Sequence, residues 1–236
     1  MSATFLKAEW RKLAMANYAI DPGVLEAYLP YRTELDYWNG TCYVSLVGFM
    51  FLDTRIRGLR IPFHVNFGEI NLRFYVKYAE QGVWKRGVVF VMEIVPRRAL
   101  SLVANVLYKE KYETMPVSHL WQSQDEHWDI TYKWGKGLVN ALRVTAGKNP
   151  EPIKEGSKEA FITEHYWGYT KVAARKTAQY EVAHPRWEVY PVKNYTIDVD
   201  FGKIYGPGFA FLKEEQPSSV FLAEGSPITV KKTTIL

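Results

Sequence analysis

Stretches of alternating apolar and polar residues recur along the chain and predict β-strands. Over residues 67–78, the even positions are Gly, Ile, Leu, Phe, Val and Tyr, while the odd positions are Phe, Glu, Asn, Arg, Tyr and Lys. A period of two predicts a strand with one apolar face and one largely polar face. Residues 127–134 alternate in the same way, whereas 41–52 are apolar on both faces, as expected of a strand covered on both sides.

Shorter patterns predict the remaining elements. Residues 86–95 form a valine-rich strand that ends before Pro96. Further strands are predicted over 117–123, 138–145, 177–182, 187–191, 195–199 and 208–213. A helix over 22–29 would begin after Asp21 and a helix over 158–166 after Ser157, because both residues are good N-caps. A third helix, over 98–108, is apolar all round and is expected to be buried.

Many strands and few helices predict a mostly antiparallel barrel or sandwich. The chain has 236 residues, of which 47% are hydrophobic and 23% charged, and this composition excludes disorder and collagen. The segment 147–152 contains two prolines and is interpreted as a loop, so residues 1–236 are expected to form a single domain. The 8 Trp, 16 Tyr and 12 Phe favour strands and leave open an aromatic-lined ligand cavity.

The net charge of +5 is scattered along the chain, so we do not expect a nucleic-acid-binding surface. The first residues lack the apolar core of a signal peptide, and no apolar stretch approaches the roughly 18 residues of a membrane span. The single cysteine, Cys42, cannot form an internal disulfide. We expect a cytoplasmic protein with no nucleic-acid or membrane partner, and we leave open a homodimer formed through exposed strand edges.

Metal and phosphate chemistry find no support in the sequence. The five histidines are far apart, and none stands at ligand spacing from a cysteine or another histidine. The sequence also contains no glycine-rich phosphate-binding loop. We therefore expect no metal and no cofactor, and we interpret the histidines as structural or surface residues.

Glu93 is the most informative carboxylate, because it stands inside the apolar run 88–95. Burial of an ionised carboxylate costs several kcal/mol unless a cation and hydrogen bonds compensate. Arg97 and Arg98 follow closely, and Arg73 lies on the polar face of the neighbouring predicted strand. These residues form either a structural ion pair that closes the barrel end or a polar cluster inside a cavity.

Four segments resemble a known family: residues 67–76, 86–97, 161–166 and 182–187. They are similar to the uncharacterised bacterial YqjF-like family, and the resemblance spans nearly the whole chain. Arg186 stands where a second proline is common in that family. The family's fold is classed with acetoacetate decarboxylase. The resemblance therefore implies a closed, cone-like antiparallel β-barrel with two or three short helices and an internal cavity.

The decarboxylase signature consists of Gly-Arg-Glu, a short gap and Pro-Lys-Lys. By this resemblance Glu93 matches the glutamate, Pro96 matches the proline, and Arg97 and Arg98 take the places of the two lysines. The Schiff-base chemistry of that enzyme needs a lysine whose amine is made neutral by a neighbouring cation. Arginine keeps its proton and cannot form the imine, so we do not expect decarboxylation through a Schiff base.

We expect the cavity to bind a small organic acid or carbonyl compound. An arginine would hold the anionic group of this ligand through two hydrogen bonds. The candidate ligand-binding residues are Arg97, Arg98, Arg73, Glu69, Tyr75 and Tyr108. If the protein is an enzyme, Glu93 is the candidate general acid–base of a lyase or hydrolase. The alternative is a structural or interaction protein whose barrel is filled by side chains and holds no small molecule.

Overall fold

The computed structural model describes residues 3–97, 111–137 and 139–236. The predicted helix over 98–108, with Arg98 and Tyr108, lies outside the described residues. Leu138, the first residue of one predicted strand, lies outside them as well.

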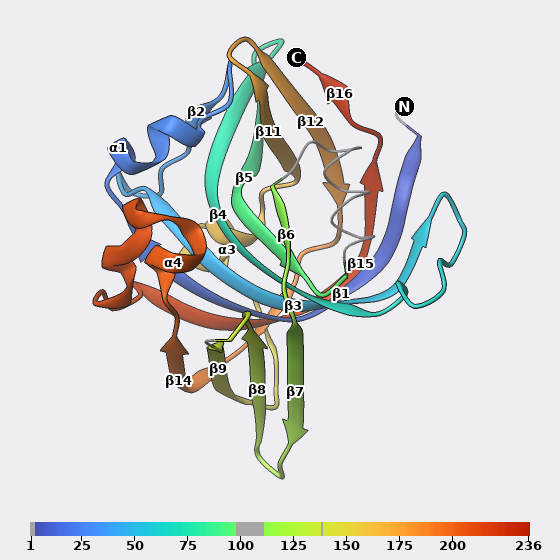
Figure 1. Ribbon diagram of the computed structural model, residues 1–236, viewed down its shortest axis with the longest axis vertical. Coiled ribbons are helices and arrows are strands. Elements are labelled where there is room, and N and C mark those ends of the chain that lie inside the picture. The colour runs from blue at the N-terminus through green and yellow to red at the C-terminus, as the bar shows by residue number, and fades with distance from the viewer. Residues whose placement is uncertain (1–2, 98–110, 138) are drawn as a thin grey trace.

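The main body is a ring of long β-strands (Figure 1). Around the ring the order is β15 (Ser219–Lys231), β1 (Thr4–Ala19), β3 (Tyr43–Ile56), β4 (Phe67–Glu80), β5 (Val83–Val95), β11 (Trp167–Ala173) and β12 (Lys176–Ala183). The ring closes because β12 pairs with β15 at Val182–Val230 and Ala183–Thr229. All neighbours in the ring are antiparallel except β5 and β11. The expected mostly-β barrel is therefore confirmed.

Short elements complete the chain. The short strands are β2 (Glu34–Leu35), β6 (Tyr112–Thr114), β10 (Glu151–Pro152), β13 (Glu188–Tyr190) and β16 (Thr234–Ile235). The helices are α1 (Pro22–Leu25), α3 (Lys158–Thr163), α4 (Phe201–Tyr205) and the 3-10 helices η1 (Glu26–Tyr28) and η2 (Pro207–Lys213). In the described ranges, each helix is far shorter than a bilayer is thick.

Two helix predictions are confirmed and one strand prediction is wrong. The Asp21 carboxylate accepts a hydrogen bond from the Gly23 amide and caps α1, and Ser157 caps α3 in the same way. The predicted strand over 208–213 is instead the 3-10 helix η2. Its two buried side chains, Phe209 and Leu212, are three residues apart, which is the repeat of a 3-10 helix.

A second, four-stranded sheet lies against the outside of the barrel wall (Figure 1). Its order is β14 (Val192–Asp198), β9 (Asn140–Gly147), β8 (His127–Trp134) and β7 (Val117–Ser123). Ile130 and Tyr132 of β8 pack with Leu46 and Leu72 of the barrel in one buried cluster. A Cβ atom on Gly48 would lie 2.9 Å from the Tyr132 ring, so glycine permits this close approach.

The barrel wall thus separates two cores, an outer core against the second sheet and an inner core inside the ring. On β4 the even-numbered Ile70, Leu72, Phe74 and Val76 belong to the outer core. The polar face predicted for this strand is buried too, because it points into the barrel. The position of polar side chains inside the ring is what creates a candidate site.

Candidate functional site

The inside of the barrel holds a cavity of about 240 Å³. Its lining comes from the inner faces of β1, β3, β4, β5, β11, β12 and β15, together with residues after α3 and β12. Most of the lining side chains are apolar or aromatic, and a few charged and polar groups stand among them. This combination is typical of small-molecule sites.

Five polar side chains on three adjacent strands form what we call the polar wall: Glu69, Asn71 and Arg73 on β4, Glu93 on β5 and Tyr112 on β6. Asn71 lies opposite Glu93 in the β4–β5 pair, and Glu93 lies opposite Tyr112 in the β5–β6 pair. The Asn71 side-chain amide donates to Glu69 Oε1 at 3.2 Å, and the Tyr112 hydroxyl donates to Glu69 Oε2 at 3.3 Å. The sheet register therefore gathers two carboxylates, an amide and a phenol at one place.

A β-bulge brings Glu93 to the cavity. Leu72 pairs with Met92 but Arg73 pairs with Phe90, so Val91 is an extra residue in β5. Before the bulge Val88 and Phe90 line the cavity, and after it Glu93 and Val95 do. If the same residues formed a regular strand without the bulge, alternation from Phe90 would direct residue 93 toward the outer core.

The Tyr112 phenol stays protonated. Burial raises the pKa of Tyr112 well above its usual value, and the nearby charges of Glu69 and Glu93 raise it further. The hydroxyl is consequently a lasting hydrogen-bond donor between the two carboxylates. Such a group can hold a proton beside a bound carbonyl oxygen.

Arg73 is a buried cation without an anion. Its exposed fraction is 7%, and in the described part of the chain it forms no ion pair while its Nε has no hydrogen-bond partner. Its guanidinium carbon lies 5.9 Å from the centre of the Tyr75 ring. An uncompensated buried charge is costly, so a negatively charged ligand in the cavity would relieve this cost.

Two histidines of the lining are neutral at physiological pH. Burial lowers the pKa of His165 to about 4, against the opposing hydrogen bond between its Nε2 and Asp36 Oδ2 at 3.1 Å. Burial likewise lowers the pKa of His184 to about 4. The charge of Arg73 lowers both pKa values further. Neutral imidazoles beside Arg73 leave the guanidinium as the main positive charge facing the cavity.

Asp36 holds His165 in place from the side opposite the cavity. Burial disfavours the charged form of Asp36, but hydrogen bonds from His165 and Arg86 outweigh this and hold its pKa at about 2. Arg86 Nε donates to Asp36 Oδ2 at 2.6 Å. No spacing or motif in the sequence links position 36 with position 165. Only the Phe-Ile-Thr-Glu-His run shared with the resembled family singled out this histidine.

The structure brings together three of the predicted site residues, Glu69, Arg73 and Glu93. Tyr75 lies outside the lining, because its hydroxyl hydrogen-bonds the Ser45 hydroxyl at 2.6 Å and its ring packs on Phe161 and His165. Arg97, expected in the site with Glu93, is absent from the described part of the cavity lining. Strand β5 ends at Val95, Pro96 breaks the ladder, and Arg97 is exposed.

The described residues also show where lysines and possible metal ligands lie relative to the cavity. Among the described residues, the cavity lining contains no lysine. The amine of Lys111 lies 4.8 Å from the centre of the Tyr28 ring, which packs on the outer core. No group of three His, Cys, Asp or Glu side chains in the described ranges is arranged to hold a metal ion.

The comparison with known families decides the relationship. The family model DUF2071, described as an uncharacterized conserved protein, matches residues 7–227. The chain belongs to this family. A curated relative is the "Uncharacterized protein YqjF" of Bacillus subtilis (strain 168), which is 32% identical over 108 residues. That match covers 45% of this chain and 43% of the relative, so it spans less than half of either protein.

Solved structures extend the comparison of this DUF2071 chain to its fold. An acetoacetate decarboxylase from Legionella pneumophila matches with a TM-score of 0.66 and 12% identity, over 99% of this chain and 88% of the other. An acetoacetate decarboxylase-like enzyme from Sphingomonas wittichii RW1 matches with 0.68 and 11%, over 99% and 94%. The enduracididine biosynthesis enzyme MppR, complexed with pyruvate, matches with 0.67 and 10%, over 100% and 91%. The fold is thus that of acetoacetate decarboxylase.

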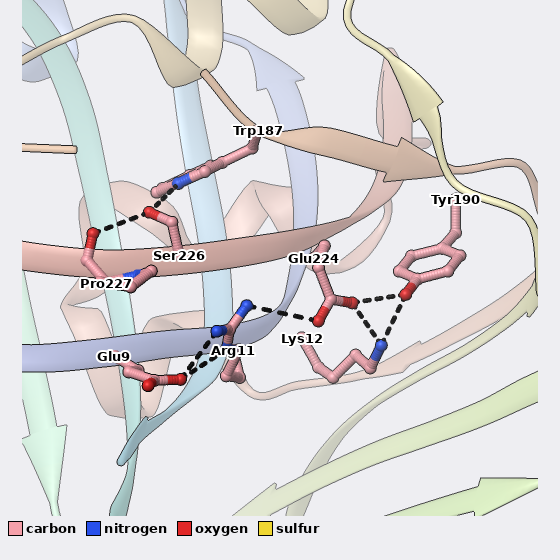
Figure 2. A network of polar contacts seen from close by, with 8 residues as sticks. All are labelled: Glu9, Arg11, Lys12, Trp187, Tyr190, Glu224, Ser226 and Pro227. Carbon is pink, nitrogen blue, oxygen red and sulfur yellow. Dashed lines mark hydrogen bonds and ion pairs between the residues drawn. The ribbon is translucent and has the colours of Figure 1, made fainter. Parts of the chain in front are cut away.

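A second buried cation in this DUF2071 protein lies on the other side of the barrel wall (Figure 2). Lys12 stands at a bulge of β1 with a φ of 53°, and its amine donates to Glu224 Oε2 at 2.5 Å and to the Tyr190 hydroxyl at 2.8 Å. The amine also lies 4.5 Å from the centre of the Trp128 ring. Arg11 joins Glu224 to Glu9, as Figure 2 shows. Unlike Arg73, this cation is fully partnered by the protein.

Proposed function

We propose that this protein binds a small organic acid or carbonyl compound in the barrel cavity, and that Arg73 holds its anionic group. The observation that carries the proposal is the burial, in a cavity of about 240 Å³, of a guanidinium that forms no ion pair with any described residue. A carboxylate is the group that best matches a guanidinium, since two parallel hydrogen bonds can form between them. MppR, a protein of the same fold, is described as complexed with pyruvate, which supports a ligand of this kind.

The polar wall would supply the remaining contacts. A ligand carboxylate at Arg73 places the neighbouring atoms near the Tyr112 hydroxyl, which can donate a hydrogen bond to a carbonyl oxygen. Glu69 and Glu93 disfavour a second anionic group at that end of the ligand. The ligand class we propose is therefore a monocarboxylate, with a carbonyl group near its acid end.

Thermal shift and isothermal titration calorimetry test the binding. Pyruvate and acetoacetate should raise the unfolding temperature of the wild type and release or absorb heat. The variant Arg73→Met should weaken binding at least tenfold, because a charge-assisted hydrogen-bonded pair contributes about 1.5–3 kcal/mol. Arg97→Met is the matched control, because it removes an exposed arginine from the same barrel and should bind as the wild type does. Equal loss in both variants, or no response in the wild type, contradicts the proposal.

A second candidate function is proton transfer at carbon next to the ligand's carbonyl group. It is favoured by the two carboxylates that flank the Tyr112 hydroxyl in a site with few water-accessible groups. Glu93 would take a proton from the ligand carbon, the carbon–hydrogen electron pair would move into an enolate, and Tyr112 would donate a hydrogen bond to its oxygen. Return of the proton completes an exchange without net reaction.

Deuterium exchange tests this second candidate. In D2O, the protein should replace the methyl protons of pyruvate with deuterium faster than buffer does, as followed by proton NMR. Glu93→Gln should abolish the acceleration while it leaves pyruvate binding within a few-fold of wild type. A Glu93→Gln variant that exchanges as fast as the wild type would remove Glu93 from this role.

Schiff-base chemistry is not part of the proposal. The resembled decarboxylase uses lysine, and arginine at 97 and 98 cannot form an imine. Reduction with borohydride in the presence of acetoacetate should therefore leave the mass of the intact protein unchanged. A mass increase that matches a reduced adduct would point to a lysine such as Lys109, which lies outside the described residues.

A further inference from the structure

The wall that faces the polar wall is apolar. In the ring order, β1, β15 and β12 follow one another on the side away from β4 and β5 (Figure 1). In the described residues these three strands supply no charged side chain to the cavity lining; they supply, for example, Leu6, Trp10, Leu13, Val182 and Val230. Apart from the phenol of Tyr180 on β12, this side of the cavity is apolar, whereas the opposite side is polar.

Aromatic rings enclose part of the apolar side. The Trp10 ring lies 5.4 Å from Phe49, 5.8 Å from Phe51 and 6.2 Å from Trp187, measured between ring centres. The rings of Phe51 and Phe67 stack at 4.7 Å. We call these five rings the aromatic end. Rings held by one another in this way form a rigid apolar surface, which suits the flat or branched tail of a ligand.

The size of the cavity sets the length of that tail. At the roughly 30 Å³ that a water molecule occupies in the liquid, a cavity of about 240 Å³ has room for about eight non-hydrogen atoms. Pyruvate leaves part of this volume unfilled, and a long-chain fatty acid exceeds it. An apolar volume without ligand atoms forgoes dispersion contacts with its lining.

We propose that the preferred ligand of this site is a short 2-oxo acid with a branched aliphatic tail. Its carboxylate lies at Arg73, its carbonyl group lies at the polar wall, and its tail packs against the aromatic end. This inference rests on the proposed function, because it names the ligand class of the same site. It goes beyond it in assigning the apolar side of the barrel a role in selectivity.

Calorimetry with a graded series of ligands tests the inference on the unmodified protein. The series is pyruvate, 2-oxobutanoate, 2-oxopentanoate and 4-methyl-2-oxopentanoate. Each buried methylene should tighten Kd by about fourfold, so 4-methyl-2-oxopentanoate should bind at least tenfold more tightly than pyruvate. If pyruvate binds and the longer acids bind equally or more weakly, the inference is overturned and the proposed function stands. If none of the acids binds, the proposed function fails and this inference fails with it.

Two adjacent positions of β12 provide a matched pair of variants. Val182→Phe adds bulk to the apolar side of the cavity, whereas Ala183→Phe adds the same ring at an exposed position. Val182→Phe should erase the tighter binding of 4-methyl-2-oxopentanoate relative to pyruvate. Ala183→Phe should reproduce the wild-type series. Retention of the full gain in a folded Val182→Phe protein overturns the placement of the tail, and the wild-type series decides the ligand class even if that variant does not fold.

Discussion

The barrel wall carries two buried cations, and they differ in what surrounds them. Lys12 faces the outer core, where Glu224 on β15, Tyr190 on β13 and Trp128 on β8 all contact its amine. Arg73 faces the cavity, and in the described residues no carboxylate pairs with it. A partnered charge is an element of structure, whereas an unpartnered charge next to empty volume indicates a missing anion. The comparison therefore distinguishes a structural cluster from the site where we propose that a ligand binds.

A β-bulge positions a charged side chain in each of the two places: Lys12 in the partnered cluster and Glu93 in the cavity. A bulge in β1 sets Lys12 between the inward-facing Trp10 and Leu13, and a bulge in β5 switches the cavity face from Phe90 to Glu93. The second sheet fixes the first bulge, because the Tyr132 hydroxyl donates to the Lys12 carbonyl at 2.7 Å. Bulges often occur where a side chain must be redirected. Here the bulge in β1 directs Lys12 toward the outer core, and the bulge in β5 directs Glu93 into the cavity.

The largest expected effect on stability comes from breaking the Lys12 cluster. Glu224→Leu removes the carboxylate that compensates a cation whose side chain is 8% exposed. We expect a loss of about 4 kcal/mol in the free energy of unfolding, measured with urea, because a buried charge is left without its partner. Ligand binding by the protein that remains folded should be unchanged.

A double variant serves as the control for that loss. Lys12→Met combined with Glu224→Leu replaces the pair by apolar side chains next to Trp128 and Tyr190, and it should recover most of the lost stability. If the double variant is no more stable than Glu224→Leu alone, the ion pair is not the origin of the effect.

Acidification should cause the second-largest loss in the free energy of unfolding. The pKa of His165 is about 4 in the folded state and near 6.5 in the unfolded chain, so the unfolded chain binds the proton first as the pH falls. The stability that this histidine contributes is complete above pH 6.5 and is lost as the pH falls to about 4. Linkage sets the loss from His165 at about 3 kcal/mol at most, and His184 adds a loss in the same direction.

Urea titrations between pH 7 and pH 4 measure this loss. His165→Gln keeps a donor that can reach Asp36 and removes the titrating ring, so its stability should fall less steeply over this range. A variant whose stability changes with pH as steeply as that of the wild type would show that His165 does not carry the effect.

Removal of Arg73 should have a smaller effect on stability, of opposite sign to that at Glu224. Without ligand, Arg73→Met takes an uncompensated charge out of the barrel interior and should leave the protein as stable as the wild type or up to about 1 kcal/mol more stable. Thermal unfolding in the absence of ligand measures it. A loss comparable to that of Glu224→Leu would mean that Arg73 is partnered after all and that the contrast between the two cations is false.

The smallest effect is expected at Arg97. Arg97→Met changes an exposed side chain beyond the end of β5 and should alter the free energy of unfolding by less than about 0.5 kcal/mol. Urea unfolding measures the change. A large destabilisation would return this arginine to the buried cluster that the sequence suggested.

Much of the barrel was predictable from alternation, and the misses have local causes. The strands 117–123 and 127–134 coincide with β7 and β8, and the alternation over 67–78 marks both faces of β4. The long strands β1 and β15 were not predicted. The bulge in β1 breaks its period, and Gly225 and Pro227 interrupt the pattern of β15. The second sheet was also missed as a separate layer, because periodicity does not reveal which sheet a strand joins.

The site was predictable in part for the same reasons. Glu93 was identified because a charge inside an apolar strand is conspicuous in sequence, and Arg73 because it lies on the polar face of the neighbouring strand. Glu69 was identified only through the resemblance to the decarboxylase. Arg97 follows Glu93 closely along the chain, but Pro96 ends the strand between them and Arg97 is exposed. His165 and Tyr112 come from segments remote from β4, and only the folded ring brings them to the polar wall.

The extra residue in β5 also affects how relatives should be compared. A homologue that matches this chain residue for residue but has no bulge at Val91 would direct its matching glutamate at the second sheet. Two chains could then agree at nearly every aligned position and still differ in whether that acid faces the cavity. The presence of the bulge between Phe90 and Glu93 is therefore a stricter criterion for shared chemistry than the glutamate itself.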